Sequence, residues 1–167
     1  MFRRLPFLTM VVSPDRPDGR RRAMKATELL REDHETLREL FERLKLSRDR
    51  EELLPTVEKE IRIHSQVEET LFYPAVREVD GAWVDAALDA HQQVEELLED
   101  LIDAVEEEEE FERIVVDLET HLNVHMDEEE GRIFPQVDER LEEQLDELGS
   151  QISQMRSELE EEWREAA

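Results

Sequence analysis

Two pairs of residues in this 167-residue chain have the spacing of a metal-ligand pair. His64 precedes Glu68 by four positions, and His125 precedes Glu129 by the same interval. Four residues are about one turn of an α-helix, so the two side chains of each pair would lie on one helix face. A carboxylate buried without a partner is costly, and a cation held by the histidine and the glutamate would remove that cost.

The two pairs belong to an internal repeat with an offset of 61 residues. Pro74 matches Pro135 at this offset, and the apolar positions between and before these anchors also correspond. The matching apolar pairs are Val57 with Leu118, Ile61 with Leu122, Ile63 with Val124, Phe72 with Ile133, and Tyr73 with Phe134. The chain is therefore interpreted as a duplicated helical hairpin.

The other half of each hairpin contributes one more histidine. His34 and His91 lie in segments that match at an offset of 57, and both occupy the apolar stripe. In these segments Leu37, Leu40, Phe41 and Leu44 align with Val94, Leu97, Leu98 and Leu101. A single histidine on an apolar face is more often a hydrogen-bonded core residue than a ligand. Here four separate helices each place one there, which favours a metal site.

Six such side chains can hold two metal ions. A carboxylate has two oxygens and can bridge two cations, and neutral imidazoles add ligands without adding charge. Two divalent ions against two carboxylates leave a net positive charge, which a bridging oxide or hydroxide would reduce. The predicted metal ligands are His34, His64, Glu68, His91, His125 and Glu129, with His121 as a further candidate.

Two residues next to this set are ambiguous. His121 lies one turn before His125 and could add a fifth nitrogen, but its repeat counterpart is Glu60. Glu95 lies one turn after His91, and its counterpart is Arg38. For each the alternative is a partly exposed helix residue, and for Glu95 that alternative is favoured.

The elements that must position these residues are helices. The chain has four Gly, six Pro and 41% charged residues in long Glu/Leu/Arg-rich runs, and no strand pattern competes. We predict an all-α fold, an up-down-up-down four-helix bundle with an additional C-terminal helix. The expected ranges are 27–47, capped by Thr27, then 55–79, 83–105 and 111–134, and a fifth helix from Leu141.

Composition divides the chain into three parts. Residues 1–25 carry a net charge of +5 against −31 for the remainder, and are expected to form a basic, disordered extension or to precede a true start at Met24. Residues 26–138 would form the bundle. Residues 139–167 would form a helix that packs on the bundle or on a partner, with Gly149 disfavouring a long coiled coil. Gly131, inside the fourth helix, is expected to allow close helix packing or, less simply, a ligand path.

Charge and cysteine content exclude several classes of function. A net charge of −26 argues against nucleic-acid binding, which needs lysine and arginine for phosphate neutralisation. The absence of cysteine excludes disulfides, thiolate nucleophiles, Cys-ligated zinc and iron–sulfur clusters. Mixed imidazole and carboxylate ligation suits iron, manganese or zinc. No segment is predicted to span a membrane, and we expect a cytoplasmic protein.

The motifs resemble those of the hemerythrin-like family, also called HHE cation-binding domains. The resemblance covers about residues 26–160 and rests on Asp33-His34-Glu35, Ala90-His91 and two long motifs, 64–74 and 125–135. It implies a non-haem di-iron centre with Glu68 and Glu129 as bridging ligands and His34, His64, His91 and His125 as terminal ones. The cofactor would be two iron ions (Fe²⁺/Fe³⁺) with a bridging oxide or hydroxide.

This chain departs from the oxygen-carrying hemerythrins at three positions. Their third helix has two histidines four apart, where this chain has His91 and Glu95, and their last carboxylate is an aspartate, where this chain has Glu129. The extra histidine here is His121, on the fourth helix. These differences argue against reversible oxygen carriage.

The leading functional prediction is a di-iron protein that binds or senses oxygen or a related small molecule. The alternatives are a di-iron enzyme that dismutates hydrogen peroxide and a non-catalytic iron store or sensor. The expected ligand is O₂ or peroxide, with neither nucleic acid nor a membrane as partner, and the chain is expected to be a monomer or a homodimer.

Overall fold

The structure, a computed structural model, describes residues 24–47 and 50–166. Within these ranges the chain forms helices and no strands, which confirms the predicted all-α class. The α-helices are α1 (Ala26–Leu46), α2 (Arg50–Val67), α3 (Tyr73–Asp103), α4 (Glu108–Glu128), α5 (Phe134–Arg140) and α6 (Leu145–Ala166). Shorter turns are the π-helices η1 (Glu68–Phe72) and η2 (Glu129–Ile133) and the 3-10 helix η3 (Glu142–Gln144).

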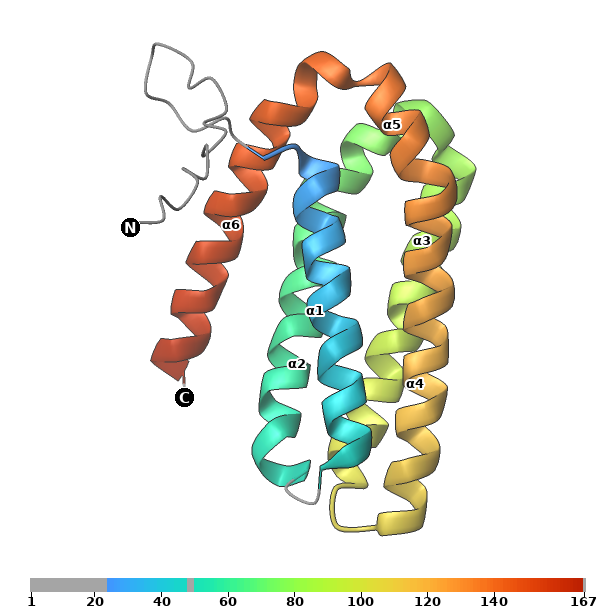
Figure 1. Cartoon of the computed structure of the whole chain (residues 1–167), viewed down its shortest axis with the longest axis vertical. Helices are drawn as coiled ribbons and strands as arrows, with labels where there is room; N and C mark the ends of the chain where they lie inside the picture. Colours follow the sequence, from blue (N-terminus) through green and yellow to red (C-terminus); the bar gives the residue numbers. More distant parts are fainter. Residues whose placement is uncertain (1–23, 48–49, 167) are drawn as a thin grey trace, which may run out of the picture.

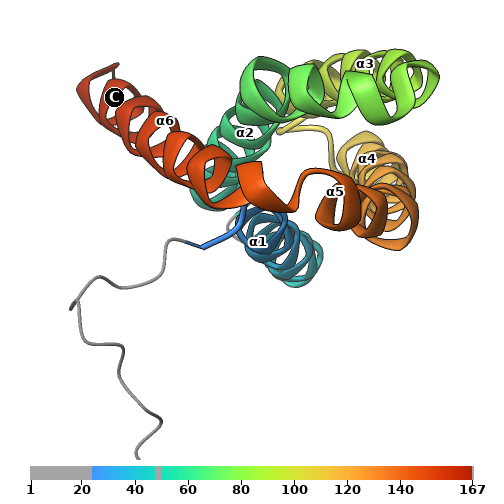
Figure 2. The ribbon, with the colours of Figure 1, turned by 90° about the horizontal axis from the view of Figure 1, so that it is seen from above.

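The long helices alternate in direction and form the predicted four-helix bundle. α1 descends, α2 ascends, α3 descends and α4 ascends in Figure 1. α2 continues through η1 into the first turns of α3, and α4 continues through η2 into α5. Viewed from above, the additional helix α6 lies on the outside of the bundle, where it packs against α1 and α2 (Figure 2).

Two helices begin earlier than predicted. α2 starts at Arg50 rather than Pro55, and Pro55 lies in its second turn, where the missing N–H costs one hydrogen bond. α4 starts at Glu108 rather than Phe111. Glu108, Glu109 and Glu110 form the first turn of α4. Carboxylates in a first turn interact favourably with the partial positive charge of a helix N-terminus, so the helix begins at these glutamates.

The expected capping role of Thr27 is wrong. α1 begins at Ala26, and its first turn is closed by the Glu28 carboxylate, which accepts a hydrogen bond from the Lys25 backbone N–H at 2.9 Å. Thr27 is buried, and its hydroxyl donates to Asp138 Oδ1 of α5 at 2.6 Å. The residue joins α1 to α5 instead of capping α1.

The predicted break at Asp80-Gly81 lies inside α3. Asp80 has non-helical angles (φ −152°, ψ 85°), and its carboxylate accepts a hydrogen bond from the Trp83 backbone N–H at 3.0 Å. Asp80 thus acts as an N-cap for the descending part of α3. Arg132 also pairs with Asp80 at 2.7 Å and ties this corner to η2.

Each repeat carries a π-helical turn immediately before its proline. The Tyr73 N–H bonds to the Glu68 carbonyl, and the Phe134 N–H bonds to the Glu129 carbonyl, both spanning five residues. The helical conformation therefore continues through both motifs and past both prolines. A π turn places residues five apart on the same side, and such turns are rare and concentrate at functional sites.

The buried apolar residues form two clusters with a polar layer between them. On α1, Leu30 belongs to the upper cluster and Leu37 to the lower one, with buried His34 between them. On α3, Ala87 and Val94 are separated in the same way by His91. The two clusters support this polar layer from above and below.

Helix α6 contributes one side to the upper cluster. Its buried apolar residues lie three, four and seven positions apart, and they are Leu145, Leu148, Ile152 and Leu159. Gly149 lies on the same face, where a Cβ atom would come within 2.0 Å of the Met24 carbonyl oxygen and 3.0 Å of the Ala26 nitrogen. A glycine is needed here because the backbones of α6 and of the start of α1 approach so closely.

Replacing Gly149 by alanine is expected to lower the free energy of unfolding by about 1–3 kcal/mol, the usual cost of overpacking a core contact. The matched control is Gly131→Ala. Gly131 is exposed, and a Cβ atom there would meet no atom within 4 Å, so close packing is not the reason for this glycine. The control should stabilise by about 0.5–1 kcal/mol through helix propensity. Urea unfolding of both variants measures the difference, and equal midpoints would contradict this account of Gly149.

The predicted N-terminal extension, residues 1–25, falls outside the described residues up to position 23. Among the described helices, none combines the length and apolar character that crossing a membrane requires.

Candidate metal centre

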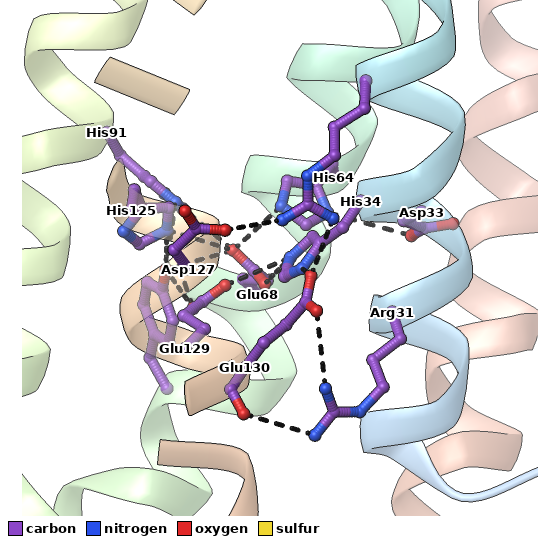
Figure 3. A network of polar contacts seen from close by, with 12 residues as sticks. Arg31, Asp33, His34, His64, Glu68, His91, His125, Asp127, Glu129 and Glu130 are labelled. Carbon is purple, nitrogen blue, oxygen red and sulfur yellow. Dashed lines mark hydrogen bonds and ion pairs between the residues drawn. The ribbon is translucent and has the colours of Figure 1, made fainter. Parts of the chain in front are cut away.

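The first cluster of possible metal ligands consists of His34, His64, Glu68 and Glu129. One ligand atom from each of the four lies within 4.8 Å of the others. His34 Nε2 lies 3.2 Å from Glu129 Oε2, and His64 Nε2 lies 3.3 Å from Glu68 Oε2. Four elements, α1, α2, η1 and η2, therefore direct their side chains to one point (Figure 3).

The second cluster consists of Glu68, His91 and His125, with the same 4.8 Å limit. His91 Nε2 lies 3.3 Å from Glu68 Oε2 and 3.0 Å from His125 Nε2. Figure 3 shows His91 and His125 on the opposite side of Glu68 from His34 and His64.

Glu68 belongs to both clusters, and Glu129 also reaches both sides. Glu129 Oε2 faces His34, whereas its Oε1 lies 3.6 Å from His125 Nε2. Both carboxylates thus lie between two groups of imidazoles, the position that a bridging ligand occupies. The structure brings together six of the seven predicted ligands, and all six are buried, with at most 5% of each residue exposed.

Several buried atoms of the first cluster have no hydrogen-bond partner among the described residues. They are His34 Nε2, both ring nitrogens of His64, Glu68 Oε1 and Glu129 Oε2. A buried polar atom without a partner costs about 1–3 kcal/mol, so such a group is rare unless something else satisfies it. A cation at the centre of the cluster would satisfy His34 Nε2, His64 Nε2, Glu68 Oε1 and Glu129 Oε2, whereas His64 Nδ1 lies on the outer side of its ring, toward Asp33.

The seventh candidate, His121, lies away from both clusters. It is exposed on α4, and its Nδ1 lies 2.8 Å from the Asp117 carbonyl oxygen one turn earlier. Glu95 is also outside the clusters and pairs with Arg62. Both side chains are engaged on their own surfaces of the bundle.

Tyr73 is a member of the site that the sequence analysis missed. Its hydroxyl can donate to Glu68 Oε2 (3.0 Å) or Glu129 Oε1 (3.2 Å), and its oxygen lies 2.9 Å from His91 Nε2 and 3.1 Å from His125 Nε2. The repeat paired Tyr73 with Phe134, and both were treated as apolar. The two residues differ only in the hydroxyl, since Phe134 stacks on His34 and has no polar group. The hydroxyl was therefore the feature of the sequence that indicated a polar role for Tyr73.

Two further carboxylates hold the outer nitrogens of two histidines. His34 Nδ1 lies 2.8 Å from Glu130 Oε1, and His91 Nδ1 lies 2.9 Å from Glu69 Oε1. Each carboxylate follows a cluster glutamate in sequence and reaches the histidine of the other hairpin. Such contacts set the ring orientation and direct Nε2 toward the centre.

Electrostatics within the site favour a protonated His34 and a protonated His91 beside an ionised Glu68. Burial opposes the charged form of His34, but the nearby carboxylates of Glu129 and Glu68 favour it more strongly and raise its pKa to about 10. Burial likewise opposes the charged form of His91, and Glu68 and Glu69 raise its pKa to about 9. Against its own burial, the neighbouring histidines hold the pKa of Glu68 well below its usual value. Burial and the two carboxylates raise the pKa of Tyr73, so the phenol keeps its proton at neutral pH.

Comparison with known proteins gives two matches and one negative result. Residues 25–137 match the family profile described as the hemerythrin HHE cation binding domain. A crystal structure of a hemerythrin HHE cation binding domain-containing protein from Mycobacterium kansasii is similar, with a TM-score of 0.66 and 28% sequence identity over 81% of this chain and 89% of that one. A search of curated proteins finds no significant match.

Proposed function

Because this chain belongs to the hemerythrin HHE cation-binding domain family, we propose that it is a non-haem di-iron protein that binds or senses oxygen or a related small molecule. The observation that carries the proposal is the sharing of Glu68 between two groups of buried ligands. One carboxylate between two imidazole groups supports a pair of ions rather than one.

The donor set fits iron. Four imidazole nitrogens and two carboxylates are ligands that suit iron, whereas calcium and magnesium prefer oxygen alone. A cation would be coordinated by the inward-facing nitrogen and oxygen atoms of the first cluster, which have no hydrogen-bond partner among the described residues. His34 and His64 would hold one ion and His91 and His125 the other, and Glu68 and Glu129 would contribute to both.

An iron pair bound here would supply electrons and an open coordination position for a small molecule. The protein residues around it would do the rest. The apolar clusters close the polar layer from above and below. Tyr73 holds a proton at its hydroxyl, within hydrogen-bond distance of both bridging carboxylates.

The proposal is tested by reconstitution with ferrous ion without oxygen, followed by exposure to air. We expect two iron ions per chain by metal analysis and charge-transfer bands in the near-ultraviolet and visible spectrum. A colourless product that retains no iron would contradict it.

Tyr73 favours a second candidate function, the dismutation of hydrogen peroxide. In this reaction one peroxide loses two electrons and two protons to become O₂, and a second takes up both to become two water molecules. The reaction therefore needs a group that holds and returns protons at the site, and the buried phenol between Glu68 and Glu129 is placed to do so.

Replacing Tyr73 by phenylalanine is expected to slow oxygen release from added peroxide by about 100-fold, the lower range for loss of a proton-transfer group. The variant keeps the ring and should still bind two iron ions, so metal content is the control. An unchanged rate at equal iron content would exclude Tyr73 from this role, and no oxygen release by the wild-type chain would exclude the candidate function.

A further inference from the structure

The C-terminal helix α6 breaks the internal symmetry of the protein. The repeat relates the two hairpins, but α6 has no counterpart in it and packs mainly against α1, α2 and η1. Asp33 also lacks a counterpart, since the position that matches it in the second hairpin is Ala90. These two asymmetric features meet in one contact.

Arg156 of α6 makes that contact. Its Nη1 lies 2.8 Å from Asp33 Oδ2, its Nη2 pairs with Glu60, and its Nε lies 3.2 Å from Glu160 Oε1. The pair with Asp33 is largely shielded from water, with 22% of the Arg156 side chain and 13% of the Asp33 side chain exposed. This contact is an ion pair, since Nη1 has no hydrogen-bond partner among the described residues, and shielding from water strengthens an ion pair of this kind.

The same Asp33 oxygen faces a ligand of the first cluster. Asp33 Oδ2 lies 3.9 Å from His64 Nδ1, a buried nitrogen without a hydrogen-bond partner among the described residues. His64 Nε2 on the other side of the ring points toward Glu68. The order of contacts is therefore Arg156, Asp33, His64 and the cluster, with Asp33 drawn beside His64 in Figure 3.

The other histidine of the first cluster also faces a carboxylate, at the shorter distance of 2.8 Å. Glu130 accepts from His34 Nδ1 and is itself held by Arg38 at 2.9 Å. Both histidines of the first cluster thus face a carboxylate that an arginine holds. In the second cluster, Glu69 faces His91 but has 43% of its side chain exposed.

We propose that Arg156 is a positioning residue of the metal centre, which holds the Asp33 carboxylate beside His64 Nδ1 and so orients His64 toward the first cluster. This inference rests on the proposed metal-binding function. Since Arg156 lies beyond residues 25–137, the segment that matches the family profile, α6 adds this control to the family's domain.

The two metal positions should consequently respond differently to changes in α6. His125, the repeat counterpart of His64, has Ala90 where His64 has Asp33, and both His125 and Ala90 line a cavity of about 290 Å³ between α3 and α4. Within the described residues α6 packs mainly against α1, α2 and η1, whereas His91 and His125 lie on α3 and α4. Loss of Arg156 should weaken binding at the first cluster and leave the second unchanged.

The test is a titration of the full chain with Co²⁺, whose visible bands report its ligand geometry at each site. Arg156→Ala is expected to weaken one of the two binding steps by about 10–100-fold, the range for loss of a residue that supports a metal ligand. Asp33→Asn should weaken the same step. The double variant should bind no more weakly than the weaker single one, because both substitutions interrupt one path.

Three further variants separate positioning from simple docking of α6. Arg156→Lys should recover part of the affinity, whereas Glu60→Gln, which removes the other buried partner, and Arg164→Ala, an exposed arginine of α6, should leave both steps unchanged. Equal loss in Glu60→Gln and Arg156→Ala, equal weakening of both steps, or unchanged affinity in Arg156→Ala would each overturn the inference. A wild-type chain that binds no Co²⁺ would instead overturn the proposed function on which it rests.

Discussion

Replacing Glu68 by glutamine is expected to reduce metal binding from two ions to at most one, with the remaining affinity at least about 100-fold weaker. Loss of a residue that only supports a metal ligand weakens metal affinity by up to about 100-fold. Loss of a ligand itself should weaken the affinity at least as much. Glu68 is the residue that the two clusters share, so this substitution removes a ligand from both. Glutamine keeps the size of the side chain but lacks the charge that balances the ions.

The measurement is metal content after reconstitution, together with a titration that resolves each binding step. Glu78→Gln serves as the control, because this glutamate is exposed on α3 and its loss changes the overall charge equally. If Glu68→Gln retained two ions at wild-type affinity, the bridging position of Glu68 would be wrong.

Metal addition is expected to raise the melting temperature by about 10–20 °C. At a free metal concentration about 100 times the dissociation constant, each site adds about 2.7 kcal/mol to the free energy of unfolding. For a chain of this size, each kcal/mol corresponds to about 2–4 °C. Two filled sites therefore give the expected range, and a chelator should reverse it.

The size of this increase should grow with pH. Raised pKa values near 10 for His34 and 9 for His91 mean that their protons stabilise the metal-free fold. That contribution is complete below about pH 6.5, the ordinary histidine value, and is lost as pH rises through about 9–10. The lowered pKa of Glu68 acts at the other end, since its contribution is present above about pH 4.5 and is lost as pH falls below that value.

Metal binding must displace the two histidine protons, so affinity should rise between neutral pH and about pH 9. Calorimetric titration in buffers of different ionisation enthalpy measures this directly, with about two protons expected to leave per pair of ions at neutral pH. Binding without proton release would contradict the assignment of His34 and His91 as ligands. Melting curves of chelated and loaded protein across the same pH range check the stability of the fold.

The sequence was sufficient to predict the fold class and that six of the seven candidate ligands face the core, whereas the seventh, His121, is exposed. Each prediction depended on positions along a single helix. The interval between His64 and Glu68 defines one face, and Leu30 and Leu37 on either side of His34 show that this face is buried. Because the interval between histidine and glutamate occurs in both repeats, the four histidines on apolar helix faces indicate a common site.

Local details were harder to predict because competing effects are of similar size. Pro55 and Phe111 were taken as helix starts, yet α2 and α4 begin earlier, at Arg50 and Glu108. A proline near a helix start costs only one hydrogen bond, and a run of glutamates suits a helix N-terminus as well as a solvated turn. Nothing in the sequence ranks these alternatives.

The π turns explain why Tyr73 was missed. Five residues on an α-helix leave two side chains well apart around the axis, so Tyr73 would not share a face with Glu68. The wider turn of η1 brings Tyr73 and Glu68 to the same side of the helix. The Tyr73 hydroxyl then lies within hydrogen-bond distance of the Glu68 and Glu129 carboxylates. A local change in helix period decides which residues enter the site.

The sequence by itself determined which side chains of each helix face the core, because a regular helix repeats every 3.6 residues regardless of its neighbours. Only the tertiary structure decided which of those side chains lie together. It joined Glu68 to both clusters, set Glu69 and Glu130 against the histidines of the opposite hairpins, placed Arg156 beside Asp33, and left His121 exposed. The physical reason is that distances between helices depend on how whole surfaces pack, including the close approach at Gly149, and the period of one helix carries no information about that packing.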